Sequence, residues 1–197
     1  QRLEKLGNIN RQVQRLVRLM DDVLTITRAE SVGFEFRPRN LDLVALCHEI
    51  IEDVKIGYAH NITINFVGEE SCHTVVVDEF LFGHILQNLS SNAVKYSKAK
   101  GIVDIHLSCS EVDIVLQVED HGIGIPKQHQ SNLFEAFRRA TNVGQIQGTG
   151  IGMTIVKRAV EAHGGTIEFT SVEGEGTTFI VKLPIINLKT KGAITEG

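Results

Sequence analysis

The sequence predicts an α+β fold in which about three helices cover one face of a mixed, mostly antiparallel sheet, preceded by one long helix. Two observations support this prediction. Several segments alternate apolar and polar residues as half-buried strands do, and some of them are separated only by a short turn. The helical segments do not alternate regularly with these strands, so we do not expect the parallel sheet of a doubly wound fold.

Length and composition fit one ordinary domain with a small addition. The chain has 197 residues, an apolar share of 42% and a net charge of −4. The negative charge argues against a nucleic-acid binder. No apolar run is long enough to span a bilayer and no signal peptide is visible, so we expect a cytoplasmic chain without direct membrane contact, either alone or as the cytoplasmic part of a membrane-bound protein. Cys47, Cys72 and Cys109 form no CxxC pair and are expected to be reduced.

Residues 3–29 are predicted to form one long amphipathic helix. Apolar residues recur there at alternating spacings of three and four, as in a heptad seam: Leu6, Ile9, Val13, Leu16, Met20 and Val23. Val17, Leu19 and Leu24 widen the stripe, which favours a helical bundle. The helix either folds back on the rest of the chain or joins a bundle between chains. We favour the second interpretation, because nothing else in the sequence supplies partner helices.

After this helix, a linker and a series of shorter elements are expected. Gly33 and Pro38 break the helical pattern over residues 31–40. The elements that follow are a helix over 41–55, strands at 61–67 and 72–77, a helix over 79–96 capped by Asp78, a hairpin around Ser110, a helix over 150–163, and two strands around the turn 173–176. The polar tail from Asn187 is expected to be frayed.

The segment LQNLSSNAVKYS, residues 86–97, lies on the second of the shorter helices. Asn88 and Asn92 are four residues apart and therefore share a face, although buried asparagines are costly unless their polar atoms are satisfied. An amide oxygen can ligate Mg²⁺ without adding a charge that repels phosphate. Lys95 can neutralise phosphate charge from the same face, and Tyr96 adds a flat surface. Alternatively, the two amides cap local backbone.

The first of two glycine clusters is VEDHGIGIP, residues 118–126. Asp120 ends a strand there, and Gly122 and Gly124 follow it. Glycine lets a ligand approach the backbone closely, and the carboxylate can accept a hydrogen bond from an amine such as that of adenine. The alternative is a surface turn with a solvated aspartate.

The second cluster is GQIQGTGIGMTI, residues 144–155, at the start of an amphipathic helix. A helix N-terminus offers free N–H donors and a positive dipole end, and Gly148, Gly150 and Gly152 would give phosphate oxygens access to them. The segment is neither a Walker A loop nor a GxGxxG motif. The alternative is a flexible loop.

In this order and spacing, the segments resemble the catalytic and ATP-binding domain of sensor histidine kinases, in the GHKL superfamily. NLSSNAVKYS resembles the N box, DHGIGI and GTGIGM the two glycine boxes, LFEAFRRA (133–140) the F box, and GEGTTF (174–179) the last glycine motif. The resemblance implies a Bergerat-type α/β sandwich. It also implies a remnant of the dimerisation and phosphotransfer hairpin at 1–30, a linker at 31–40, the ATP-binding domain at 41–186 and a tail at 187–197.

The resemblance further implies Mg²⁺ and ATP as cofactors and assigns roles to residues. Asn92 would ligate the metal, and Asp120 would accept a hydrogen bond from adenine. The catalytic set would be Asn88, Lys95 and Arg139. Arg139 would reach the γ-phosphate from a mobile lid at about 138–147, anchored by Phe134 and Phe137. The other nucleotide-binding positions would be Tyr96, Gly122, Gly124, Ile125, Phe137, Gly148, Thr149, Gly150, Ile151, Gly152 and Thr178.

The implied function is transfer of the γ-phosphoryl group to a histidine on a dimerisation-domain helix in two-component signalling. The implied partners are that helix, a response regulator and a second copy of the parent protein. The sequence holds no HExxTPL-like phosphoacceptor segment, and His48 lies after the linker, where it does not fit that role. The chain is therefore either truncated upstream or has lost the site, and we do not expect it to autophosphorylate alone. A regulatory nucleotide-binding module without phosphotransfer is the alternative. ATP hydrolysis is disfavoured, because hydrolytic relatives carry a glutamate at the position of Asn88.

Overall fold

The computed structural model describes residues 34–57, 62–99, 101–144, 146 and 148–185, together with Val13, Met20 and Leu24. The elements follow in the order β1 (Arg39–Leu41), α2 (Leu43–Gly57), β2 (Thr63–Gly68), η1 (Glu70–His73), β3 (Val75–Val77), α3 (Glu79–Tyr96), β4 (Ile102–Cys109), β5 (Asp113–Asp120), α4 (Lys127–Gln130), η2 (Thr141–Val143), α5 (Gly152–Ala162), β6 (Thr166–Val172) and β7 (Gly176–Pro184).

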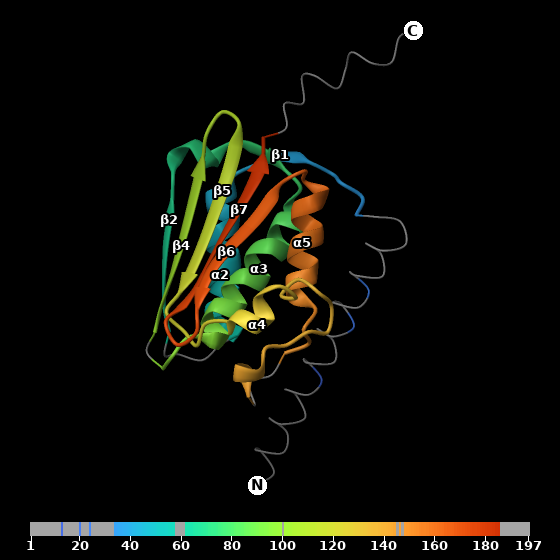
Figure 1. Ribbon diagram of the computed structural model, residues 1–197. Helices are drawn as coiled ribbons and strands as arrows, with labels where there is room; N and C mark the ends of the chain where they lie inside the picture. Colours follow the sequence, from blue (N-terminus) through green and yellow to red (C-terminus); the bar gives the residue numbers. More distant parts are fainter. Residues whose placement is uncertain are drawn as a thin grey trace, which may run out of the picture.

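The main sheet has five strands in the order β2-β4-β5-β7-β6. The β2–β4 pair is parallel, and the other three pairs are antiparallel. Helices α2, α3 and α5 lie together on one face of this sheet (Figure 1). Strands β1 and β3 form a separate, antiparallel two-stranded sheet. The predicted α+β fold with a mixed, mostly antiparallel sheet is confirmed.

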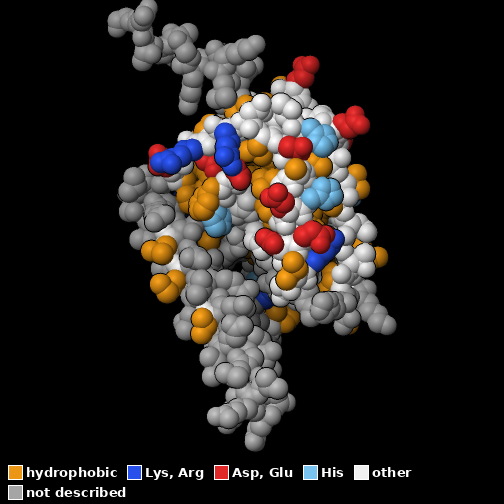
Figure 2. All heavy atoms as spheres, turned by 180° about the vertical axis from the view of Figure 1, so that it is seen from behind, with side chains coloured by type: hydrophobic (Ala, Val, Ile, Leu, Met, Phe, Trp, Pro, Cys, Tyr) orange, Lys and Arg blue, Asp and Glu red, His pale blue; other side chains and the backbone are white. Residues whose placement is uncertain are grey.

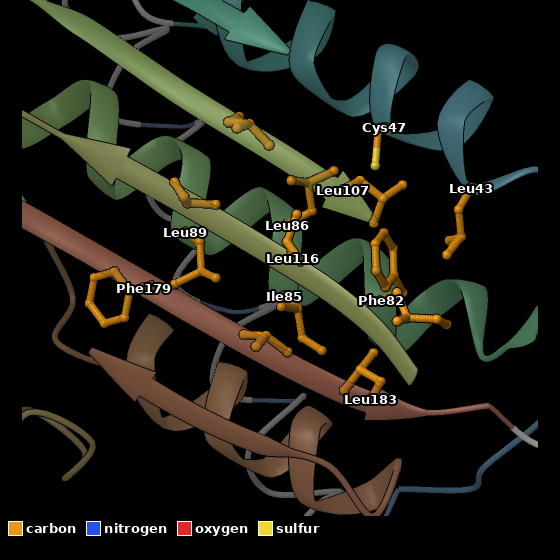
Figure 3. Close-up of a cluster of buried hydrophobic side chains, with 14 of the residues drawn as sticks. Leu43, Cys47, Phe82, Ile85, Leu86, Leu89, Leu107, Leu116, Phe179 and Leu183 are labelled. Atoms are coloured by element: carbon orange, nitrogen blue, oxygen red, sulfur yellow. The ribbon is translucent and has the colours of Figure 1, made fainter. Parts of the chain in front are cut away.

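The core fills the space between the sheet and the helices, because the strands alternate inward apolar and outward polar residues. In β5, for example, Ile114, Leu116 and Val118 are buried. The inward residues meet an apolar face of α3 that includes Phe82, Ile85, Leu86 and Leu89, as Figure 3 shows. Burial of this continuous apolar surface holds α3 against the sheet, and α3 carries the asparagines of the N box.

The start of α3 agrees with the sequence prediction. Asp78 has an extended backbone, and its side chain accepts a hydrogen bond from the Leu81 N–H at 3.0 Å, which satisfies one of the helix's free donors. The helix runs from Glu79 to Tyr96, as predicted. This cap fixes where the helix begins and therefore which of its residues face α5.

Two expectations are corrected by the structure. Residues 72–77 do not form one strand: η1 covers Glu70–His73, and only Val75–Val77 are extended. Cys72 and Cys109 are joined in a disulfide, with Cα atoms 5.3 Å apart, rather than reduced. The Glu69 N–H donates to the Leu107 carbonyl at 3.0 Å and so docks η1 on the end of β4. The two cysteines meet for this reason, although 37 positions separate them.

Cys47 has a free thiol in the core, and burial raises its pKa to about 12. The thiolate is the reactive form of cysteine, so this thiol is expected to be inert near neutral pH.

Most of the predicted helix over 3–29 and the tail from Asn187 lie outside the described residues. Val13, Met20 and Leu24 are helical, and each of these residues is at least half exposed, at 50%, 63% and 51%. In the predicted linker, residues 34–38 have no regular structure, and Arg39 and Asn40 pair with β3. Within the described part of the chain, no helix is long and apolar enough to cross a membrane.

On the face opposite to the view of Figure 1, several acidic and histidine side chains lie near one another, among hydrophobic and basic ones (Figure 2). The exposed residues of α2 include His48, Glu49, Glu52, Asp53 and Lys55.

Candidate functional site

A cavity of about 780 Å³ opens between α3, the start of α5 and the segment that joins β5 to α5. This volume is typical of small-molecule and cofactor sites. Most of the residues predicted from the sequence line it: Asn88, Asn92, Lys95, Tyr96, Asp120, Gly124, Ile125, Arg139, Gly148, Thr149, Gly150 and Gly152. The three motifs are thus brought together around one space.

The polar face of α3 lies against the glycine-rich start of α5. The Asn88 amide nitrogen donates to the His84 carbonyl at 2.9 Å, which fixes the direction of its carboxamide oxygen. That oxygen occupies the place where a side chain at position 152 would begin, so Gly152 is needed for the two helices to meet. Four residues further along α3, the Asn92 amide nitrogen lies 3.4 Å from the Met153 sulfur.

The end of α3 is tied to the first glycine cluster. The Tyr96 carbonyl accepts a hydrogen bond from the Ile123 N–H at 3.0 Å. A side chain at position 122 would collide with the same carbonyl. Gly122 therefore does not line the cavity, but its small size lets the cluster lie against Tyr96. The Lys95 ammonium lies 4.9 Å from the centre of the Tyr96 ring, within the range of a cation–π contact.

Asp120 is the last residue of β5 and is only 7% exposed. One of its carboxylate oxygens accepts from the Gly122 N–H at 2.8 Å. Burial raises the pKa of Asp120 to about 6, and the Gly122 hydrogen bond and nearby His121 partly oppose that rise. A buried carboxylate at the wall of a cavity is well suited to accept a hydrogen bond from an amino group.

The segment after α4 forms the remaining wall and includes the predicted lid. Arg139 lines the cavity, and its guanidinium donates to the Ile146 carbonyl within the same segment. Phe134 packs edge-on against Phe169 of β6, with ring centres 6.0 Å apart, as an anchor would. Phe137 has a φ of +63° and is 70% exposed, so its side chain does not act as a packed anchor. Its N–H donates to the Gly150 carbonyl at 2.9 Å, so its backbone connects the lid to the second glycine cluster.

Four predicted nucleotide-binding residues do not line the cavity: Gly122, Phe137, Ile151 and Thr178. Ile151 is fully buried in the core. Thr178 lies on the outer face of the sheet, because side chains alternate along β7, and the residue that reaches the cavity is its neighbour Thr177. The alternation of buried Phe179 and Val181 could have indicated this from the sequence.

The cavity wall also contains residues that the sequence did not single out, among them His84, His129, Asn142 and Phe179. Phe179 follows from the same strand alternation as Thr177. His84 lies one helical turn before Asn88, and this spacing could have placed it on the same face. No pattern in the sequence pointed to Asn142.

The fold and the site together define the class of protein. A family model described as histidine kinase-, DNA gyrase B-, and HSP90-like ATPase matches residues 77–187, and the chain belongs to this family. Within it, the chain is of the histidine-kinase type, as its relatives show.

The sensor histidine kinase WalK of Bacillus subtilis (strain 168) is 31% identical over 178 residues, which are 88% of this chain and 29% of WalK. The adaptive-response sensory kinase SasA of Synechocystis is 28% identical over 188 residues, 93% of this chain and 49% of SasA. The structure of full-length ShkA in complex with AMPPNP matches with a TM-score of 0.73 and 27% identity over 88% of this chain and 36% of ShkA. The chain spans less than half the length of each of these three proteins.

Proposed function

We propose that the chain binds Mg²⁺–ATP in this cavity and presents the γ-phosphoryl group to a histidine on a dimerisation-domain helix, in cytoplasmic two-component signalling. The observation that carries the proposal is the placement of Asp120 and the Asn88–Asn92–Lys95 face around one cavity. In this proposal, residues 41–186 form the ATP-binding domain, residues 1–30 belong to the dimerisation hairpin, and 31–40 link the two.

Asp120 marks the end of the cavity that would receive the base. Its buried carboxylate would accept a hydrogen bond from the exocyclic amine of adenine. Tyr96 lies beside it, because Ile123 and Gly122 hold the first glycine cluster against the Tyr96 carbonyl. Asn88 is eight residues from Tyr96, which is about 12 Å along a helix. The α3 face is therefore long enough to follow a nucleotide from the base toward its phosphates.

Asn88, Asn92, Lys95 and the start of α5 would bind the phosphate end. The Asn92 amide nitrogen faces the Met153 sulfur, so the carboxamide oxygen is the group left for a ligand. Neutral oxygen donors beside phosphate suit Mg²⁺, which prefers oxygen ligands and binds substrate phosphates with few protein groups. Asn92, with Asn88 near it, would hold the ion, which neutralises negative charge on the phosphates when bound.

The phosphoryl transfer would depend on positioning and charge rather than on a nucleophile from this chain. The attacking group would be an imidazole nitrogen of the dimerisation-domain helix, with ADP as the leaving group. Lys95 and the helix α5 N-terminus would stabilise charge on the phosphates. Arg139 would have to leave the Ile146 carbonyl to reach the γ-phosphate, so its contribution requires a change in the lid. A second copy of the parent protein and a response regulator would complete the signalling pathway.

The test is to mix the chain with γ-labelled ATP and a separate helical hairpin that carries an HExxTPL-type segment. We expect acid-labile label on the hairpin histidine and formation of ADP. The Asn92→Ala chain is the control and should transfer little label. If the chain binds ATP by calorimetry but transfers no label to any such hairpin, the regulatory module without phosphotransfer is the better description. Absence of ATP binding would refute both.

A further inference from the structure

Asn142 connects the middle of the lid to the base end of the cavity. It lies in η2, and its amide nitrogen donates to the Gly124 carbonyl at 2.9 Å and to the Ile123 carbonyl at 3.3 Å. Ile123 and Gly124 belong to the loop that follows Asp120 and that also lines the cavity. One side chain of the lid therefore bonds directly to the backbone beside the predicted adenine position.

The orientation of this amide follows from its partners. Carbonyl oxygens only accept hydrogen bonds, so the nitrogen and not the oxygen of Asn142 must face Ile123 and Gly124. The carboxamide oxygen then points away from them. It is buried and accepts no hydrogen bond in the structure. A buried acceptor without a donor is unfavourable, so this contact combines two favourable hydrogen bonds with one unsatisfied group.

The same loop is bonded to a second carboxamide from the neighbouring segment. Gln130, at the end of α4, donates to the Ile125 carbonyl at 2.9 Å and to the Ser171 carbonyl at 3.1 Å. The carbonyls of residues 123, 124 and 125 thus all receive side-chain amides. These residues lie between β5 and α4, outside regular secondary structure. The Ile123 carbonyl also accepts from the Gly174 N–H at 2.8 Å, whereas at Gly124 and Ile125 the side-chain amides take the place of a backbone donor. Gln130 precedes the lid, whereas Asn142 lies within it. Its neighbour Thr141 also contacts α4, since its N–H donates to the His129 ring at 3.3 Å, but Asn142 is the lid residue that bonds to the loop after Asp120.

We propose that Asn142 is a positioning residue for the nucleotide: it is a latch that holds the lid on the base-end loop and keeps the cavity formed before the nucleotide arrives. The inference deepens the proposed function and rests on it for the identity of the bound molecule. A preformed site binds more tightly, because less order has to be imposed on binding. The unsatisfied oxygen lowers the stability of the closed latch, which lets the lid open for nucleotide entry and release.

The experiment compares Asn142→Asp and Asn142→Leu with the parent chain. Both variants keep the approximate size of the side chain and remove the two donated hydrogen bonds. In the nucleotide-free protein, we expect amide hydrogen exchange of residues 138–144 to rise by about fivefold to tenfold in both variants, as expected for loss of one or two net hydrogen bonds. The dissociation constants for ATP and for ADP should rise by a similar factor, because the latch lies at the base end and not at the γ-phosphate.

Asn65→Ala is the matched control. Asn65 of β2 donates to Asp104 of β4 at 2.8 Å in an exposed side-chain pair, so its removal costs one side-chain hydrogen bond away from the cavity. It should change neither lid exchange nor nucleotide affinity. Exchange in the lid that stays at the parent level in both Asn142 variants, or unchanged affinities for both nucleotides, would overturn the proposal.

A second measurement needs no variant. The Asn142 side-chain NH₂ should exchange its hydrogens slowly in the nucleotide-free parent chain by NMR, because both donated bonds are internal; fast exchange would also overturn the latch. If the parent chain does not bind ATP, the proposed function fails, while both exchange measurements still decide on the latch.

Discussion

Asp120 combines a buried position with the charge that the proposed function requires. Burial raises its pKa to about 6, so the carboxyl group becomes protonated at a mildly acidic pH. The protonated group is a poorer partner for the adenine amine, because that amine is itself a donor. We therefore expect ATP affinity to be constant above about pH 7 and to weaken as the pH falls below about 6. Calorimetric titrations across this range measure the change.

Asp120→Asn should bind ATP more weakly at neutral pH and lose this pH dependence. The raised pKa also makes the stability of the fold depend on pH, because the folded state binds the Asp120 proton more tightly than the unfolded state does. The contribution of Asp120 to stability is therefore fully present below pH 3.8 and is lost as the pH rises through about 6. If the ATP affinity of Asp120→Asn still weakens as the pH falls below about 6, another group is responsible for the titration.

Asn92 is the residue on which the metal prediction depends. Asn92→Ala removes the carboxamide from the α3 face, where the residue is only partly buried, so the fold should persist. We expect the dissociation constant for ATP in the presence of Mg²⁺ to rise by about tenfold or more, as for loss of one charge-assisted contact. Affinity for ATP in excess chelator should change little. Equal losses with and without the metal would remove Asn92 from the metal role.

The site was predictable from the sequence where spacing decides which side chains meet. Asn88, Asn92 and Lys95 share a helix face, and the structure brings that face to the same cavity as Asp120 and Gly152. Their roles toward ATP and Mg²⁺ stay predictions. The last glycine motif indicates Thr178, but strand alternation along β7 turns this residue to the outer face. Asn142 could not be found, because its partners depend on how the lid folds over the loop after β5.

At the scale of single elements, the disulfide between Cys72 and Cys109 fastens η1 to the end of β4. Closing a chain segment of 37 residues reduces the conformational freedom of the unfolded state. We expect reduction of this bond to lower the free energy of unfolding by about 3–4 kcal/mol. Thermal unfolding with and without reductant measures the effect, and peptide mapping without reduction should find the two cysteines joined.

Comparing Cys47→Ala with the double variant Cys72→Ser/Cys109→Ser distinguishes the free thiol from the disulfide. Only the double variant should lose its sensitivity to reductant, since Cys47 has no sulfur partner. Two free thiols at Cys72 and Cys109 in the native, unreduced protein would contradict the pairing.

Elements with local signals were predicted well, and those that depend on distant contacts were not. The cap at Asp78 and the apolar face of α3 gave the bounds of that helix, and the turn around Ser110 gave the β4–β5 hairpin. The segment 72–77 reads as a strand, yet docking against Leu107 turns its beginning into η1. The disulfide follows from the same docking, which neither cysteine's neighbours in the sequence reveal.

At the scale of the whole molecule, Asp78 joins the segment before β1 to both helices that form the cavity. One carboxylate oxygen caps α3 through the Leu81 N–H, and the other accepts from the Arg37 N–H at 2.6 Å. The Asp78 N–H donates to the His163 ring at 3.3 Å, at the end of α5. Phe36, next to Arg37, packs edge-on against that ring with centres 5.0 Å apart. The segment before β1 is thereby attached to α3 and α5 at the ends that lie away from the asparagines and glycines of the site.

Asp78→Ala should therefore loosen this junction as well as the helix cap. Two accepted hydrogen bonds at a position 3% exposed are lost, and we expect the free energy of unfolding to fall by about 2–4 kcal/mol. Asp78→Asn keeps an oxygen for the Leu81 N–H but turns its amide toward the Arg37 N–H, so it should lose about half as much. Urea unfolding measures both variants. Equal losses would show that the Arg37 bond accounts for the whole effect and that the cap contributes nothing, whereas an unchanged stability of Asp78→Asn would show that only the cap matters.

The junction also predicts how stability depends on pH. Burial lowers the pKa of His163 below 6.5, so the folded state favours the neutral ring, whose Nε2 accepts from Asp78 while Nδ1 donates to the Ala159 carbonyl at 2.8 Å. Its contribution to stability is complete above about pH 6.5 and is lost as the pH falls through the lowered pKa, because the unfolded state then binds the additional proton. His163→Gln, which retains an acceptor and a donor but does not titrate, should unfold at urea concentrations that change less between about pH 7 and pH 5 than those of the parent chain. An identical pH dependence in the parent and the variant would place the titration elsewhere and leave His163 with a packing role against Phe36.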